Sequence, residues 1–281
     1  MQNGFFRTKS LDQILADCDH PDYRLKRTLT VWDLTALGIG AIIGTGIFVL
    51  IGTAVVGDAS RPGAGPGIIL SFILSGTACA LAALCYAEFA AMIPVAGSAY
   101  TYSYATLGEF LAWITGWNLI LEYGVACVAV AIGWSGYFNN ILKTVGIVLP
   151  EWATRAPGEG GIANLPAAII VLLVTIVLVI GVKESARTTG VIVAVKLAVI
   201  LFFLAVGSSA VDPGNWVPFM PNGFQGVGAA AAIVFFAYIG FDAVSTTAEE
   251  ARNPQRDIPL SIIASLGVCT TLYVAVAAVL T

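Results

Sequence analysis

Charged residues are scarce in this sequence, and their scarcity excludes most soluble folds. Asp, Glu, Lys and Arg together make up 11% of the 281 residues, whereas 58% of the residues are hydrophobic. In a typical soluble domain about a quarter of the residues are charged. The mean hydropathy of +0.89 and the long uncharged blocks therefore favour a protein whose main solvent is the lipid bilayer.

Histidine is scarce and paired cysteines are lacking, which argues against metal and disulfide chemistry. The one histidine is His20, in the polar first thirty residues. The five cysteines form no CxxC pattern, and four of them lie inside apolar runs. A cysteine in such a run usually acts as a small buried hydrophobic residue. We therefore expect no cofactor and no metal site.

Two functional classes lack their usual sequence signals. The basic residues fall in short segments between apolar runs and form no stripe that could follow a phosphate backbone, so we expect no nucleic-acid partner. The sequence contains no HExxH, no GxSxG and no pair of membrane aspartates, so we do not expect an intramembrane enzyme. No early apolar segment of the signal-peptide type is present.

What the sequence does contain is apolar runs long enough to cross a bilayer. A spanning helix needs about 20 mostly apolar residues. Seven runs meet this length, at 32–56, 67–92, 109–138, 164–182, 189–210, 227–248 and 260–281. We therefore predict an all-α, polytopic membrane protein, with a cytoplasmic leader at 1–31 and a transmembrane domain at 32–281.

Lysine and arginine are divided unevenly between the two ends of the predicted spans. Five lie in the leader, two after the fourth span and two after the sixth, whereas three lie on the opposite side. Since basic loops stay on the cytoplasmic side, we predict a multi-pass protein of the cell membrane with a cytoplasmic N-terminus. Thr281 then falls on the outer side at the end of an apolar run, which is typical of a truncated chain.

Glycine is concentrated in the first predicted span, where a helix tolerates it poorly. Gly38, Gly40, Gly44 and Gly46 fall within nine residues, and each costs about 1 kcal/mol of helix propensity relative to alanine. Irregular backbone at membrane depth is tolerated only where protein covers it or a cavity lies beside it. We predict that this helix unwinds near Gly44–Gly46. The alternative is that Gly40 and Gly44 form a face for close helix packing.

The sixth predicted span is interrupted as well, by Gly240 and Asp242 within an apolar stretch. A pair of interrupted spans points to the binding site of a transporter. At each break, one half-helix presents unpaired N–H groups to a carboxylate, and the other presents unpaired carbonyls to an ammonium group. An amino acid carries both charges, so two broken helices suit it as a substrate.

Three ionisable residues lie inside the predicted spans, namely Glu122, Lys196 and Asp242. Each costs at least about 2.5 kcal/mol near the bilayer centre, which makes each a functional candidate. Lys196 either faces the bundle interior, where it can gain and lose a proton during a transport cycle, or reaches the cytoplasmic interface along its own stem. Glu122 and Asp242 are partners for this lysine, gates for a cationic substrate, or acceptors for exposed backbone N–H groups.

Three stretches carry a more specific signal. They are residues 38–48 of the first span, residues 236–250 of the sixth, and the loop sequence Ala-Arg-Asn-Pro-Gln-Arg-Asp-Ile-Pro at 251–259. Together they resemble the amino acid, polyamine and organocation (APC) transporters, and within them the bacterial relatives of the cationic amino-acid transporters. The resemblance implies inverted five-helix repeats with broken helices 1 and 6, working by alternating access. The second repeat would be incomplete in this chain.

The resemblance also implies roles for individual residues. Family positions on the carboxylate side of the substrate are matched by Ile42, Thr45 and Gly46. Family positions that contact its amino group and side chain are matched by Phe236, Ala237 and Ile239.

Two of the matched positions imply more than a substrate contact. Phe236 also resembles an aromatic gate. Lys196 matches a lysine that takes the place of a sodium ion in proton-coupled relatives. The resemblance therefore implies a proton as the coupling ion.

A seven-helix receptor or photoreceptor, with Lys196 as a Schiff-base lysine, is the alternative class of protein. It matches the number of spans but gives no reason for the broken first span or for the 251–259 sequence. We predict instead a secondary active permease that moves amino acids together with protons across the bilayer. Whether the substrate is cationic or neutral depends on where Glu122 and Asp242 point, which the sequence leaves open.

Overall fold

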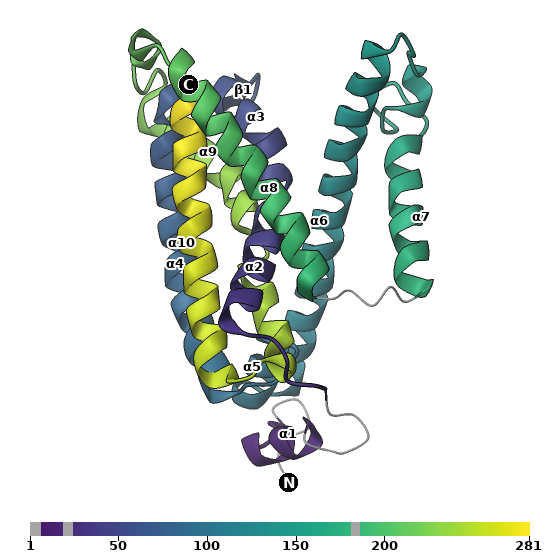
Figure 1. The fold of residues 1–281 in the computed structure, drawn as a ribbon, viewed down its shortest axis with the longest axis vertical. Coiled ribbons are helices and arrows are strands. Elements are labelled where there is room, and N and C mark those ends of the chain that lie inside the picture. Colours follow the sequence, from purple (N-terminus) through teal and green to yellow (C-terminus); the bar gives the residue numbers. More distant parts are fainter. Residues whose placement is uncertain (1–6, 19–24, 181–185) are drawn as a thin grey trace. The chain divides into compact units, whose positions relative to one another are not determined.

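The computed structural model describes residues 7–18, 25–180 and 186–281 (Figure 1). Almost all of its regular structure is helical. The described strands are the antiparallel two-residue pair β1 (Gly57–Asp58) and β2 (Arg61–Pro62). The chain divides into two compact units, one comprising Met1–Gly116 and Ser185–Thr281, the other Trp117–Glu184. The prediction of an all-α fold is confirmed.

Six helical stretches of the described chain are long and apolar enough to cross a membrane. They are Val31–Val56, Gly65–Met92, Glu109–Thr144, Gly190–Ala210, Gly223–Glu250 and Pro254–Leu280. The fourth predicted span corresponds to α7 (Leu165–Ile180), of which the apolar part Leu165–Val177 is shorter than the others. The protein is thus a polytopic membrane protein, and its division into seven spans stays a prediction. Residues 181–182, the end of the fourth predicted span, lie outside the described residues.

The first span consists of three helical pieces. α2 (Val31–Ile42) is followed by a short π-helix, η2 (Gly46–Leu50), and by α3 (Ile51–Val56). α2 begins at Val31 because a capping box precedes it: the Asp33 carboxylate accepts the Thr30 N–H at 2.9 Å, and the Thr30 hydroxyl oxygen accepts the Asp33 N–H at 3.4 Å.

The sixth span is also built from three pieces. α9 (Gly223–Val234) continues into the 3-10 helix η7 (Phe235–Tyr238), and the 3-10 helix η8 (Phe241–Glu250) follows after a break. The preceding span, α8 (Ala186–Gly207), leads into α9 through two short 3-10 helices, η5 (Ser208–Ala210) and η6 (Pro213–Trp216).

Two unbroken helices pack beside these broken spans in the first unit. α4 (Ile68–Met92) follows the short 3-10 helix η3 (Gly65–Gly67), and α10 (Pro254–Leu280) packs against α4, α2 and α8. α4 and α10 run in opposite directions, and so do the first and sixth spans (Figure 1). This is the relation expected when a broken span and its following helix are repeated with inverted topology.

Three segments outside the predicted spans are helical. α10 begins at Pro254 instead of residue 260, because a proline at the first helical position loses no hydrogen bond. Pro259 lies inside α10 at the cost of one further bond. The segment after α4, which contains no basic residue, forms α5 (Ser98–Thr106). The leader likewise contains a short helix, α1 (Leu11–Cys18).

The second unit contains the greater part of α6 (Glu109–Thr144), the 3-10 helix η4 (Glu151–Ala153) and α7. With 36 residues, α6 is about 54 Å long and continues six residues beyond the predicted end at 138. The start of α7 is fixed by Asn164, whose side-chain oxygen accepts the Ser135 hydroxyl at 2.7 Å and the Ala167 N–H at 3.1 Å.

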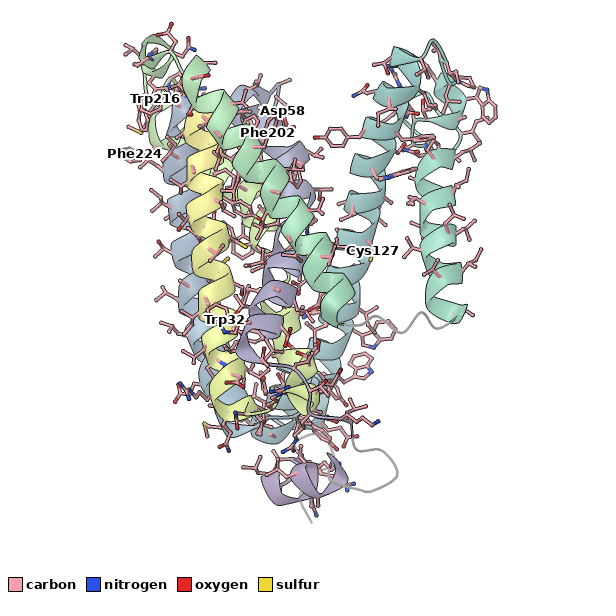
Figure 2. All side chains as sticks on the ribbon, viewed as in Figure 1. Trp32, Asp58, Cys127, Phe202, Trp216 and Phe224 are labelled. Carbon is pink, nitrogen blue, oxygen red and sulfur yellow. The ribbon has the colours of Figure 1, made fainter. Side chains whose placement is uncertain are left out.

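Large apolar side chains lie on the outside of the first unit. The exposed fraction is 81% for Trp32, 70% for Phe202 and 78% for Phe224 (Figure 2). The interior of this unit holds a fully buried aromatic cluster of Phe72, Tyr238 and Tyr273. Apolar residues on both the inside and the outside are what a bundle surrounded by lipid requires.

Candidate functional site

The first span is interrupted at Ile43 and Gly44, between α2 and η2. Ile43 leaves the helix with φ −73° and ψ 105°, while its N–H still donates to the Ile39 carbonyl at 3.0 Å. The prediction placed the unwinding near Gly44–Gly46, so its start was one residue too late, and Gly46 already belongs to the next helix. The break itself is present in the span where glycine content indicated it.

The sixth span is interrupted at Ile239 and Gly240, between η7 and η8. Ile239 is extended, with φ −56° and ψ 137°, and Gly240 adopts φ 104°. Most residues with a side chain avoid this positive φ. A Cβ atom on Gly240 would also lie 2.9 Å from the carbonyl oxygen of Ala41. Both the backbone conformation and the contact with the first span therefore require glycine.

The two broken spans touch where Gly46 meets Ala237. A Cβ atom on Gly46 would lie 2.3 Å from both the Cα and the Cβ of Ala237, so no larger residue fits without separating the spans. Gly44 differs, since a Cβ there would have nothing within 4 Å. Gly46 thus permits the contact between the spans, and open space lies beside Gly44.

The alternative interpretation of these glycines holds for one of them. A Cβ atom on Gly40 would lie 2.9 Å from a methyl group of Val193 on α8. Gly40 is therefore a packing position. Gly44, the other member of the proposed packing pair, has no such neighbour in the described chain.

Tyr273 of α10 links the two breaks. Its side chain is fully buried, and its hydroxyl lies 3.0 Å from the carbonyl oxygen of Ile42 and 2.8 Å from that of Ala237. The hydroxyl has a single proton, so it donates to one carbonyl at a time or is shared by both. The end of α2 and the end of η7 are thereby held by one side chain.

Lys196 of α8 faces the interior of the first unit. Its Nζ donates to the carbonyl oxygens of Gly40 at 2.9 Å and of Ile43 at 2.7 Å. Gly40 lies in the last turn of α2 and Ile43 directly follows the helix, at the end where the helix dipole favours a cation. Of the two alternatives for this residue, the interior position is therefore observed, and the extension to the interface is not.

Four backbone carbonyls near the breaks, those of Gly40, Ile42, Ile43 and Ala237, accept hydrogen bonds from Tyr273 or Lys196. The sequence suggested unpaired carbonyls for an ammonium group. Each carbonyl has two lone pairs, so a ligand cation would share these acceptors with the two side chains or displace them.

Thr45 provides an unused hydrogen-bonding group at the first break. Its hydroxyl oxygen is buried and has no partner among the described residues. The N–H groups at the start of the following helix have no intrahelical acceptor. A hydroxyl without a partner next to the start of a helix is suited to a carboxylate, and Gly44, with open space beside it, directly precedes Thr45.

The remaining matched residues lie around the same two breaks. Ile42 is 2% exposed and gives its carbonyl to Tyr273. Ala237 is buried against Gly46. Phe236 and Ile239 are half-buried on the segment that carries the second break, where the Phe236 carbonyl accepts the Ile239 N–H at 3.3 Å.

The two acidic candidates have different surroundings. Asp242 is 3% exposed in the first turn of η8, where its carboxylate accepts the Ser98 hydroxyl from α5 at 3.2 Å. Acceptance of hydrogen bonds is thus one of its roles. Glu122 lies on α6 in the second unit, and its part in the site stays a prediction.

Tyr273 was the functional candidate that sequence reasoning missed. In the sequence it is one aromatic residue in a long apolar run, where a lipid-facing position is as common as a buried one. A usable signal was its hydroxyl, because a tyrosine buried in a membrane bundle needs a hydrogen-bond partner.

The sequence matches a family of known proteins. The family described as amino acid permease matches residues 29–281. This chain belongs to the amino acid permease family. The resemblance to APC transporters is thereby confirmed, and nothing in the comparison supports a seven-helix receptor.

Proteins similar to this chain occur in a bacterium and in a plant. The methylthioribose transporter of Bacillus subtilis (strain 168) is 53% identical over 281 residues, covering 99% of this chain and 59% of that protein. The branched-chain amino acid permease BcaP of the same organism is 53% identical over 285 residues, covering 100% and 60%. The vacuolar cationic amino acid transporter 2 of Arabidopsis thaliana is 43% identical over 284 residues, covering 98% and 43%.

The two bacterial relatives are longer than this chain and are named for different substrates. The chain spans about three fifths of the length of the two bacterial relatives. Both are 53% identical to it, yet their names give different substrates, methylthioribose and branched-chain amino acids. Overall identity therefore indicates the family and leaves the substrate open.

Proposed function

We propose that this chain forms the substrate-binding part of a secondary active permease that moves an amino acid across the cell membrane by alternating access. The observation that carries this proposal is the meeting of two broken spans at Gly46 and Ala237, beside the unpaired hydroxyl of Thr45 and the open space at Gly44. Its membership of the amino acid permease family supports the same conclusion.

The substrate would lie between the breaks with its two charged groups pointing in opposite directions. Its carboxylate would accept hydrogen bonds from the Thr45 hydroxyl and from the first N–H groups of η2. Its amino group would face the carbonyl end of η7, and its side chain would lie against Phe236 and Ile239. Phe236 would then also close the site as a gate. The substrate leaves the site chemically unchanged, so no enzymatic step is involved.

The coupling ion in this proposal is a proton carried by Lys196. In its protonated form, Nζ donates to Gly40 and Ile43 and neutralises the negative end of α2. Loss of the proton removes this charge and weakens the restraint on the first break. Release of the substrate and release of the proton would thus both change the bonding at the break that follows α2.

The orientation in this proposal follows from the arginines. Arg27, Arg252 and Arg256 line one cavity at the end of the first unit where α4 ends and α10 begins. By the preference of basic residues for the cytoplasmic side, this end and the leader face the cytoplasm. Arg24 and Lys183, which contributed to the same prediction, lie outside the described residues.

The test is a thermal-shift screen of the detergent-purified full-length permease against the standard amino acids and methylthioribose. A ligand at about 100 times its Kd stabilises the folded state by about 2.7 kcal/mol. We expect a related group of amino acids to stabilise the protein, and Thr45→Val to abolish the shift without lowering the melting temperature of the free protein.

Two results would count against this assignment. Stabilisation by methylthioribose alone would show that the site binds a substrate of a different class. A Thr45→Val variant that responds to amino acids as the wild type does would show that the break in the first span is not the binding site.

A further inference from the structure

A cavity of about 590 Å³ lies at one end of the first unit, away from the helix breaks. Three arginines line it: Arg27 from the leader, and Arg252 and Arg256 from the junction between η8 and α10. Arg27 and Arg252 are separated by more than two hundred residues in sequence. Their convergence on one cavity needs a structural cause, which the hydrogen bonds of the leader provide.

The leader is held on this junction by backbone hydrogen bonds. The N–H groups of Thr28 and Leu29 both donate to the Glu250 carbonyl, at 2.9 and 3.0 Å, and the Arg252 N–H donates to the Leu29 carbonyl at 2.9 Å. Because Arg27 directly precedes Thr28, this short pairing fixes its backbone beside that of Arg252.

The side chains of the junction arginines are available to a ligand. Arg252 donates through Nε to the Thr28 carbonyl at 3.1 Å, which orients its guanidinium group and leaves its terminal N–H groups for another acceptor. Arg256 is exposed, and none of the described residues forms a hydrogen bond or an ion pair with its side chain.

The acidic residues near the cavity are bonded at its rim. The Asp257 carboxylate accepts the N–H of Asn253 at 3.3 Å, and the Glu249 carboxylate accepts the N–H of Ala96 at 3.1 Å. Asp33 interacts with Arg252 at longer range while bonded to Thr30. These carboxylates accept hydrogen bonds from the backbone or from Thr30, and no acidic residue is among the described residues that line the cavity.

The start of α10 adds to the positive potential. Pro254 is the first residue of this helix and lines the cavity together with Gln255. The N-terminal end of a helix carries partial positive charge. Guanidinium groups offer paired N–H donors that match the oxygens of a phosphate group.

We propose that this cavity binds a phosphate group. It lies where α4 and η8 end and α10 begins, at the ends of three apolar stretches long enough to cross a membrane, and headgroups border the hydrocarbon core that such stretches span. Basic pockets between spans at the cytoplasmic interface bind anionic headgroups. An anionic phospholipid is therefore the favoured source of the phosphate, and soluble phosphate is the other. Binding would join the leader to the sixth and seventh spans.

The test titrates the detergent-purified full-length protein with short-chain phosphatidylglycerol, phosphatidylcholine and inorganic phosphate, using the melting temperature as the readout. We expect saturable stabilisation by phosphatidylglycerol and none by phosphatidylcholine. The double variant Arg252→Gln with Arg256→Gln should bind phosphatidylglycerol at least about tenfold more weakly. Arg256→Gln alone, which breaks no bond of the described chain, should show part of this loss.

The control variant is Arg155→Gln, which removes an exposed arginine that pairs with Glu151 at 3.1 Å in the second unit. It should bind phosphatidylglycerol as the wild type does. Stabilisation by inorganic phosphate that competes with phosphatidylglycerol would identify soluble phosphate as the ligand. An equal response to phosphatidylcholine, or unchanged binding in the double variant, would overturn the proposal. None of these readouts depends on amino-acid transport.

Discussion

At the scale of single residues, the geometry of the breaks depends on a few side chains that bond to backbone atoms. Tyr273 and Lys196 together bond to four carbonyls at the ends of α2 and η7. Irregular backbone at membrane depth survives only when its polar groups find partners. The two side chains therefore stabilise the breaks and also limit which backbone groups a substrate can use.

Replacing Tyr273 with phenylalanine tests this dependence. The ring would keep its contacts with Phe72 and Tyr238, at centroid distances of 5.5 and 5.3 Å, while the hydroxyl would be lost. Leaving buried carbonyls unpaired costs about 1–3 kcal/mol. We expect a lower melting temperature and a substrate affinity reduced about tenfold, equivalent to about 1.4 kcal/mol.

The matched control for this prediction is Tyr238→Phe. Tyr238 belongs to the same aromatic cluster, and its hydroxyl donates to the Phe72 carbonyl at 2.9 Å. Phe72 lies on the unbroken helix α4, so this bond does not hold a helix break. This variant should be destabilised without losing substrate affinity. Equal affinities in the two variants would show that Tyr273 is only a packing residue.

At the scale of elements, the sequence predicted the broken spans better than it predicted their ends. Glycine content and an acidic residue located both interruptions, because lipid makes irregular backbone unusual. The start of α10 at Pro254 and the helix α5 were missed. The start of α10 was missed because proline usually breaks a helix, although the first helical position accepts it. The role of Tyr273 was missed because its hydroxyl bonds to residues 231 and 36 positions away in sequence.

The contact between the first and sixth spans gives a prediction at this scale. In Gly46→Ala, the new methyl group would overlap Ala237 and push the two breaks apart. We expect the protein to insert into the membrane but to lose detectable substrate binding in a titration of the purified variant.

The control for this substitution is Gly52→Ala on α3, where a Cβ atom would meet nothing within 4 Å. Alanine there should raise helix stability by up to about 1 kcal/mol and leave affinity unchanged. Wild-type affinity in Gly46→Ala would mean that the substrate does not need the two spans in close contact.

At the scale of the whole molecule, the first unit combines two broken spans, two antiparallel helices that follow them, and a leader bonded to the junction after the sixth span. The family and the all-α fold could be predicted from sequence motifs and hydropathy. Substrate identity could not, since the bonded carbonyls and the open space at Gly44 depend on the packing of distant helices.

Proton coupling is the property of the complete transport cycle that Lys196 should control. In Lys196→Met, the aliphatic stem stays but no group can donate to Gly40 and Ile43 or carry a proton. We expect uptake into proteoliposomes containing the full-length permease to become independent of an imposed proton gradient, while exchange of substrate across the membrane continues.

Because methionine removes charge as well as hydrogen bonds, Lys196→Arg is the matched control: it retains a cation that holds its proton at any working pH. Arginine should preserve substrate binding and still abolish the response to the gradient. Gradient-dependent uptake by either variant would assign coupling to another residue, with Glu122 and Asp242 the next to replace.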